Sequence, residues 1–284
     1  MSAERTEAEA GMEPPRLLIL GAHPDDAEFH AGGLASLYRR LGNTVKMVSV
    51  TNGGAGHHRY SSAELVAIRR KEAAAAGAVI GATYETWDFP DGSLLPTLEV
   101  RERIIREIRS FRPDLVLTHR TNDYHPDHRA VGQAVQDASY MVTVPLVVSD
   151  APILTRDPVV AYMPDLFTRP CPLRPDVTLD ATPMMDTILE MLACHQSQVF
   201  DFLPFNEGYA QPVPDEPAMR HDWLRGWFLN RVARRADRFR SALIDQYGPE
   251  RGNAAVLAEV YEISEYAAHL EPAARARLFP VDCV

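Results

Sequence analysis

The stretch RLLILGAHPDDAEF, residues 16–29, decides the fold of this chain. It opens with a short apolar run within residues 16–21, which is typical of a strand buried on both faces of a sheet. A second such run, TVKMVSV at residues 44–50, follows a segment of helical composition, residues 32–41, that ends at Gly42. Strand, helix and strand in this order predict a βαβ unit with a right-handed crossover.

The alternation of strands and helices continues along the chain. Residues 61–64 (SSAE) have the spacing of a capping box and begin an Ala-rich helix that ends at Gly77. The apolar residues of 97–111 recur on one helical face, and Pro113 ends that segment. The remaining predicted elements are strands at 84–89, 114–119 and 159–163 and helices at 128–141 and 182–195. This order predicts an α/β fold, a Rossmann-like, mostly parallel sheet with helices on both faces.

A single α/β domain is expected over residues 16–284, because 284 residues suffice for one large domain with a sizeable core. Residues 1–15 are polar and acidic, and we expect a flexible N-terminal tail there. Two helices, residues 219–247 and 249–270, are expected to form a C-terminal helical extension over about 218–270.

The composition indicates which classes of binding partner and which cellular compartment to expect. A formal net charge of -10 and the lack of a Lys/Arg block argue against a nucleic acid or an anionic membrane as partner. The three cysteines, Cys171, Cys194 and Cys283, are scattered and predict no disulfide framework, so a reducing compartment is the simpler reading. The first residues lack the apolar segment of a signal peptide, which favours the cytoplasm. The oligomeric state stays open, and a homo-oligomer is compatible with the sequence.

Histidines and aspartates gather where the predicted strands end. The first strand runs into AHPDDAE (22–28), the second into TNGGAGHH (51–58) and a later one into HRTNDYHPDH (119–128). These three segments hold six of the ten histidines, together with four aspartates. Because ligands of open α/β sheets bind beyond the carboxyl ends of the strands, we expect these side chains to meet.

Histidine and carboxylate together suit Zn²⁺ or Fe²⁺ with an open position for water. A metal of this kind lowers the pKa of water to about 7. One of the adjacent Asp25 and Asp26 can bind the metal while the other faces the substrate, because neighbouring side chains of an extended segment point to opposite sides. The structural alternative is that His-Pro-Asp forms ordinary turns. Two such segments, each directly after an apolar strand, weigh against that alternative.

The segments AHPDD (22–26) and HPDH (125–128) resemble the two signature segments of the PIG-L/LmbE-like de-N-acetylases. That family includes deacetylases of N-acetylglucosaminyl lipids and of the precursors of mycothiol and bacillithiol. The resemblance covers about residues 16–200 and implies one Zn²⁺ per chain as the cofactor. By similarity, the metal ligands are His23, Asp26 and His128.

The resemblance also implies catalytic roles for three residues. Asp25 would be the general base, and His125 would be the electrophile or acid beside the developing oxyanion. Asp127 would orient or charge His125. One departure concerns the acid that commonly follows the second aspartate directly, because Ala27 stands there and Glu28 comes one residue later.

Three further residues are candidates for substrate binding. The family often has a substrate-contacting Arg in the helix after the second strand, which points to Arg69; a solvated basic face is the alternative. His57 follows two glycines on a strand-end loop and can line the substrate mouth or lie on a mobile surface. His195 belongs to an HxSQ segment found in many relatives, although the helix macrodipole also explains a histidine at a helix end.

The hypothesis that follows is a zinc-dependent hydrolase that removes an N-acyl group, with N-acetyl expected, from a sugar-like small molecule such as an amino-sugar conjugate. A non-haem iron oxygenase is an alternative, because two histidines and one carboxylate also make its facial triad. A non-catalytic small-molecule-binding α/β module is a second alternative. The chain has no GxGxxG after the first strand, no GxxxxGK and no GxSxG, which argues against nucleotide binding and a serine hydrolase.

Overall fold

The structure is a computed structural model that describes residues 13–209 and 213–284, so most of the expected tail, residues 1–15, lies outside the described residues. The strands are β1 (Arg16–Gly21), β2 (Thr44–Thr51), β3 (Thr83–Phe89), β4 (Leu115–Thr118), β5 (Val159–Tyr162), β6 (Val177–Asp180) and β7 (Ala258–Ile263). The helices are α1 (Asp26–Arg40), α2 (Ser62–Val79), α3 (Leu98–Phe111), α4 (Pro126–Ala138), α5 (Met185–Cys194), α6 (Leu203–Asn206), α7 (Pro217–Arg238), α8 (Arg240–Ala254) and α9 (Pro272–Leu278).

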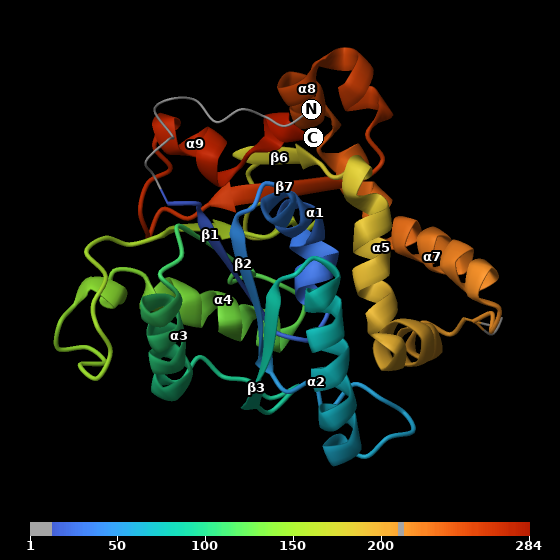
Figure 1. Ribbon diagram of the computed structural model, residues 1–284, viewed down its shortest axis with the longest axis horizontal. Helices are drawn as coiled ribbons and strands as arrows, with labels where there is room; N and C mark the ends of the chain where they lie inside the picture. The colour runs from blue at the N-terminus through green and yellow to red at the C-terminus, as the bar shows by residue number, and fades with distance from the viewer. Residues whose placement is uncertain (1–12, 210–212) are drawn as a thin grey trace.

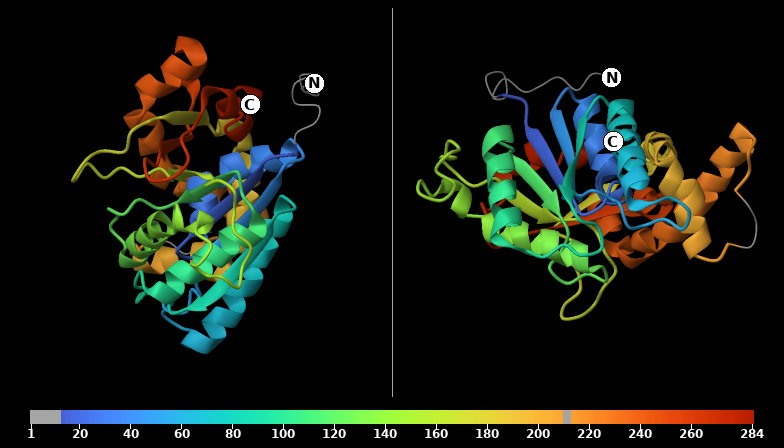
Figure 2. Two further views of the ribbon diagram at one scale, coloured as in Figure 1. Left: turned by 90° about the vertical axis from the view of Figure 1, so that its left-hand side faces the viewer. Right: turned by 90° about the horizontal axis from the view of Figure 1, so that it is seen from below.

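In the described part of the chain, seven strands form one sheet in the order β3-β2-β1-β4-β5-β7-β6. β1 to β5 are parallel, whereas β7 runs antiparallel to both β5 and β6. Helices α1, α2, α5 and α7 pack on one face, and α3 and α4 cover the other (Figures 1 and 2). The predicted Rossmann-like α/β fold is confirmed.

The register of the parallel strands brings their carboxyl ends to one edge. Gly21 at the end of β1 pairs with Ser49 of β2, and Leu20 pairs with Thr118 at the end of β4. The loops that follow these three strands therefore leave the sheet side by side. Neighbouring strands of a sheet lie about 4.8 Å apart, so side chains at these ends come within contact distance.

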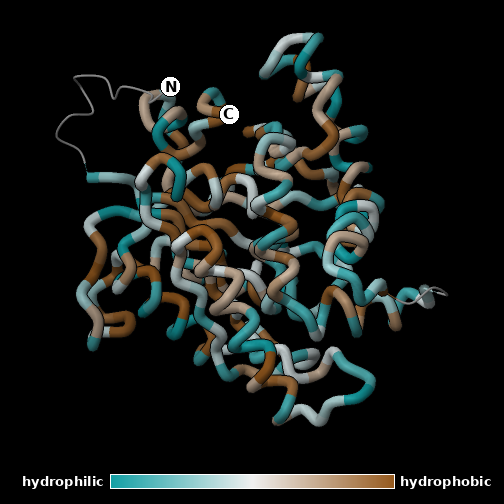
Figure 3. Tube along the Cα trace, turned by 45° about the vertical axis from the view of Figure 1, so that its right-hand side comes forward, coloured by the Kyte–Doolittle hydropathy of each residue, from teal (hydrophilic) through white to brown (hydrophobic). Residues whose placement is uncertain are grey.

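The hydrophobic residues gather in the middle of the molecule, along the strands and the inner faces of the helices (Figure 3). Leu17 to Leu20 of β1 are fully buried, as expected for a strand covered on both faces. In α2 the predicted capping box is present, with Ser61 and Glu64 bonding each other's backbone N–H. Among the described residues, no helix is both long and apolar enough to cross a membrane.

Several sequence-based boundaries differ from the structure. The helix expected over 219–247 is divided at Phe239 between α7 and α8. α1 begins at Asp26 and α4 at Pro126, earlier than the predicted starts at 32 and 128, so both helices begin inside the His-Pro-Asp segments. The expected helix over 249–270 is wrong for residues 258–263, which form β7. This segment, AEVYEI, contains β-branched and aromatic residues, and pairing with the distant β5 and β6 decides its conformation.

Arg109 on α3 holds together the long connection between α4 and β5. Its guanidinium is 1% exposed and donates hydrogen bonds to six carbonyl oxygens of that connection. The acceptors are Met141, Val142, Val144, Val147, Val148 and Ala151. The side chain thus binds together a segment whose only regular element is a short 3-10 helix at Met141–Thr143.

We expect Arg109→Met to lower the free energy of unfolding by roughly 2–4 kcal/mol, because several buried carbonyl groups lose their donor. The matched control is Arg106→Met on the same helix, whose side chain is 37% exposed and pairs with Asp150. The control should leave the unfolding midpoint nearly unchanged. Urea unfolding of both variants measures the difference, and equal midpoints would contradict the role assigned to Arg109.

Candidate metal centre

A cavity of about 690 Å³ lies at the carboxyl ends of the parallel strands. The loops after β1, β2, β3 and β4 contribute to its wall, and α7 closes one side. The site residues predicted from sequence that line it are His23, Asp25, Asp26, Arg69, His125 and His128. The segments that the sequence placed at separate strand ends therefore share one pocket.

Asp26 is fixed so that one carboxylate oxygen stays free for a ligand. Its Oδ2 accepts the backbone N–H groups of Ala22 and His23, both at 2.8 Å, and lies 3.0 Å from Nε2 of His119. Oδ1 lies 3.4 Å from Nε2 of His128. The turn requires glycine at Gly21, because a Cβ there would lie 2.8 Å from Cβ of Asp26.

His128 lies close to a second carboxylate, Asp123. Its Nδ1 lies 3.1 Å from Oδ1 of Asp123, which leaves Nε2 directed at Asp26. A carboxylate that holds the second ring nitrogen fixes the tautomer and the direction of a ligating histidine. Burial lowers the pKa of His128, but Asp26 and Asp123 outweigh burial and raise it to about 10.

His23 lies between this pair and two further carboxylates. Its Nε2 is 3.2 Å from Asp127 Oδ2 and 3.3 Å from Asp91 Oδ1, whereas Nδ1 is 3.6 Å from Asp26 Oδ2. Burial lowers the pKa of His23, but the bonds to Asp127 and Asp91 outweigh burial and raise it to about 9. The geometry leaves Nδ1 as the nitrogen that faces Asp26.

The donor chemistry of this centre fits a divalent metal. Possible ligand atoms of His23, His125 and His128 lie within 4.8 Å of one another, and so do those of Asp26, His119 and His128. Neither group is the predicted set of His23, Asp26 and His128, which shares two residues with each of them. Several buried carboxylates surround these rings, so the site attracts positive charge, as the raised pKa values of His23 and His128 also indicate. Two imidazoles, a carboxylate and an open cavity are the arrangement of a catalytic zinc site.

Asp25 lies beside the centre in a constrained backbone conformation. Its φ of 141° is unusual for a residue with a side chain, and such strain of about 1–3 kcal/mol is concentrated at functional sites. The backbone N–H donates to the Tyr84 hydroxyl at 3.1 Å, and the carboxylate lies 3.5 Å from Arg69. Burial raises the pKa of Asp25 to about 6 against the opposing pull of Arg69. A carboxylate of this basicity suits a general base near neutral pH.

His125 is set up as a hydrogen-bond donor to the pocket. It is the N-cap residue of α4, and its Nδ1 accepts the backbone N–H of Asp127 at 3.2 Å. Burial and the neighbouring His23 and His128 lower the pKa of His125, so the ring is neutral. A neutral ring that accepts at Nδ1 carries its proton at Nε2.

The carboxylate of Asp127 makes no hydrogen bond to the His125 ring, but its charge raises the pKa of His125, which is the second of the two roles expected from sequence. It accepts the backbone N–H groups of Gly92 at 2.6 Å and Leu94 at 3.0 Å and lies against His23. The contact with the His125 ring comes from the backbone of Asp127, because both residues form the first turn of α4.

The three candidates for substrate binding lie in different surroundings. Arg69 lines the cavity but is 2% exposed, and it donates to the carbonyl oxygens of Pro24 and Gly53. His195 is fully buried outside the cavity lining, with Nε2 2.8 Å from Oε1 of Glu28. His57 also lies outside the lining, with Nε2 3.2 Å from Asp201.

Several residues that contact the candidate ligands were not predicted from the sequence. Asp91 follows β3, so the rule that was applied to the ends of the other strands would have found it. Asp123 and His119 were noted in the segment after β4, but their contacts with His128 and Asp26 depend on the fold. Tyr84 lies 3.5 Å from Glu28 beneath Asp25, and no local pattern signals that contact.

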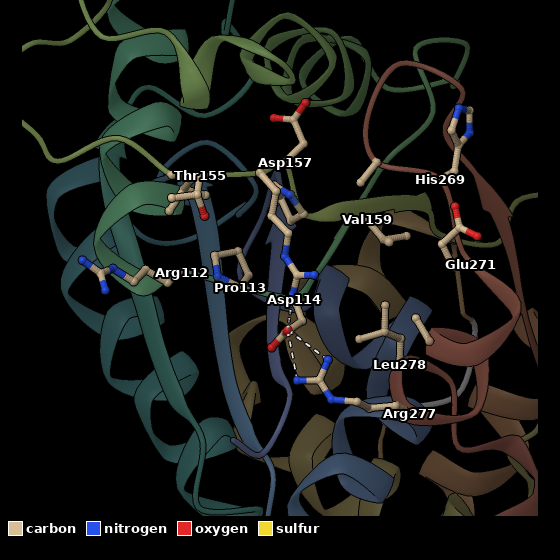
Figure 4. A pocket seen from close by; sticks show the side chains of 15 residues that line it. Arg112, Pro113, Asp114, Thr155, Asp157, Val159, His269, Glu271, Arg277 and Leu278 are labelled. Carbon is tan, nitrogen blue, oxygen red and sulfur yellow. Dashed lines mark hydrogen bonds and ion pairs between the residues drawn. The ribbon is translucent and has the colours of Figure 1, made fainter. Parts of the chain in front are cut away.

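A separate hollow lies at the opposite edge of the sheet, before the start of β4. Figure 4 shows Arg277 directed at Asp114 there, and the two Arg277 nitrogens lie 3.1 Å from Asp114 Oδ1. None of the site residues predicted from sequence lines this hollow. The predicted site residues that line a cavity are therefore those at the carboxyl edge of the sheet.

Comparison with known proteins supports the family resemblance. Residues 18–139 match the family described as PIG-L: GlcNAc-PI de-N-acetylase. This match spans 122 of the 284 residues, and that part of the chain resembles the PIG-L family. The resemblance predicted from AHPDD and HPDH is thereby confirmed.

Similar proteins include enzymes of two kinds. The chain is 27% identical over 189 residues to 4-oxalmesaconate hydratase of Pseudomonas putida. This alignment covers 64% of this chain and 73% of that one. The chain is also 27% identical over 190 residues to diacetylchitobiose deacetylase of Thermococcus kodakarensis, covering 64% of this chain and 70% of that one. The solved structure of 4-carboxy-2-hydroxymuconate hydratase from Pseudomonas putida superposes with a TM-score of 0.69 at 20% identity, covering 90% of this chain and 99% of that one. This last likeness shows a common fold.

Proposed function

We propose that this protein is a zinc-dependent hydrolase that removes an N-acyl group, with N-acetyl expected, from a small molecule. The observation that carries the proposal is the placement of Asp25, with a pKa of about 6, beside the His23, Asp26 and His128 centre. The deacetylase named among its relatives supports an amide as the substrate.

Zn²⁺ held by His23, Asp26 and His128 would act as a Lewis acid and lower the pKa of water towards ~7. The Asp25 carboxylate accepts the proton of the water that attacks the acyl carbon. The Nε2–H of His125 donates to the carbonyl oxygen as that oxygen gains negative charge. The C–N bond then breaks, and the proton held at Asp25 passes to the leaving nitrogen. The products are an amine and a carboxylic acid.

A hydratase is the second candidate, and the specific observation in its favour is the similarity to 4-oxalmesaconate hydratase over 64% of the chain. Both reactions begin when Asp25 takes a proton from an attacking water. They differ in the fate of the adduct, because a hydratase adds water across a double bond and releases no amine.

Amine release in the absence of O₂ tests the proposal against the iron-oxygenase alternative. With the zinc-loaded protein and a panel of N-acetyl amino sugars and their conjugates, we expect a free primary amine and equal rates with and without O₂, because hydrolysis requires no change of metal oxidation state. Activity that needed O₂ and failed with zinc would eliminate the hydrolase. Water addition to unsaturated dicarboxylates without amine release would select the hydratase.

A further inference from the structure

The wall of the cavity that α7 contributes contains a buried arginine that forms no direct ion pair with any described residue. Arg235 is 9% exposed and lines the cavity. Within residues 13–209 and 213–284, no carboxylate lies within 4.0 Å of its guanidinium. The carboxylates of Glu259 and Asp165 act on Arg235 only from beyond contact distance. A buried cation without a direct partner is costly, because it has lost water.

The protein fixes Arg235 but does not use all of its donors. Nη1 donates to the carbonyl oxygen of Phe29 at 2.6 Å, and Nη2 lies 3.0 Å from Nδ1 of His30. A guanidinium has five N–H donors, and further donors remain for a ligand. Burial lowers the pKa of Arg235 to about 10, which keeps the group charged at neutral pH.

One histidine ring, that of His30, lies between Arg235 and the candidate metal centre. The His30 ring, which Arg235 contacts, has its centroid 6.5 Å from that of His128 and 5.7 Å from that of His119. Arg235 is therefore separated from the ligand histidines by one imidazole. Its neighbour Arg231, one helical turn earlier, also lines the cavity but pairs with Glu207, so its charge is balanced.

We propose that Arg235 binds an anionic oxygen group of the substrate, a carboxylate or a phosphate, while the reacting carbon lies at the metal centre. A planar guanidinium matches the two oxygens of either group. Phe29, Leu166, Phe202, Leu203 and Val232 line the same cavity and provide an apolar surface for the carbon skeleton between the two ends. This proposal deepens the proposed function and rests on it for the contact at the metal centre. It predicts that acidic substrates are preferred over neutral ones.

Calorimetric titration of the zinc-loaded protein with glutarate, its diamide glutaramide and inorganic phosphate tests the proposal. We expect the anions to bind and glutaramide to bind at least roughly tenfold more weakly, because the amide offers the guanidinium no charge. Arg235→Gln should weaken anion binding by about tenfold or more, and Arg235→Lys should retain part of it. Whichever of glutarate and phosphate binds more tightly indicates whether the anionic group of the substrate is a carboxylate or a phosphate.

The matched control is Arg225→Gln on the same helix, whose side chain is 46% exposed and pairs with Asp186. It should bind all three probes as the wild type does. Equal binding of glutarate and glutaramide by the wild type would overturn the proposal, and this comparison requires no variant. Wild-type anion affinity in a folded Arg235→Gln variant with normal metal content would overturn it too. A protein that binds no metal would refute the proposed function, whereas the dependence on Arg235 would still be measurable in the same titration.

Discussion

The Asp25→Asn variant is expected to lose activity by about 10²-fold or more in kcat and to keep its metal. The amide preserves the size of the side chain and removes its basicity, so the attacking water loses its proton acceptor. The Asp25 carboxylate is held near Arg69 and is distinct from the Asp26 oxygen that faces His128. Steady-state kinetics and elemental analysis of the same preparation measure the two effects together.

Two neighbouring substitutions give the controls for this experiment. Asp26→Asn should lower the metal content, because it removes the charged oxygen opposite His128. Asp88→Asn on β3, whose side chain is 87% exposed, should change neither quantity. If Asp25→Asn lost the metal and Asp26→Asn kept it, the roles of the two carboxylates would be reversed.

The second large effect is expected for the His128→Ala variant, which should lose most of the roughly one Zn²⁺ per chain of the wild type. A catalytic zinc site has three protein ligands, and removal of one leaves too few to hold the ion. His128 is 3% exposed and lies between Asp26 and Asp123, with its Nε2 3.4 Å from Oδ1 of Asp26. Elemental analysis after dialysis against zinc-free buffer measures the loss.

His221→Ala is the matched control, because His221 lies on α7 with a side chain 52% exposed. Its metal content should equal that of the wild type. Equal metal content in His128→Ala would remove His128 from the ligand set and would leave the group of His23 and His125 to be tested next.

The strand ends were predictable because each HPD segment follows directly on a run of buried residues. Residues 17–21 are apolar, and the parallel pairing of β1 with β2 follows from the βαβ pattern, whereas the pairing with β4 depends on the order of the strands in the sheet. The histidines and aspartates at the strand ends were therefore predictable from the sequence, whereas the choice of His23, Asp26 and His128 as ligands came from the family resemblance. Asp91 was overlooked because the segment after β3 contains no histidine to draw attention to it.

The supporting contacts were beyond the reach of the sequence, because they join residues far apart in the chain. Glu28 bonds His195 across 167 positions, and Asp25 bonds Tyr84 across 59. Neither distance follows from local periodicity. The exchange of helix for strand at 258–263 has the same origin, since a short segment of mixed propensity takes the conformation that its partners impose.

The position of β7 ties the completion of the sheet to the end of the chain. β7 lies between β5 and β6, two strands that precede it by many residues and do not pair with each other. During synthesis, both must leave the ribosome with unpaired edges and remain so until residues 258–263 follow. Unpaired edges are sites of aggregation, so a nascent or truncated chain that ends before β7 would be vulnerable in a way that the finished protein is not. Glu259 of β7 also accepts the N–H groups of Gly33 and Leu34 in α1, so this late strand secures the helix that begins at Asp26.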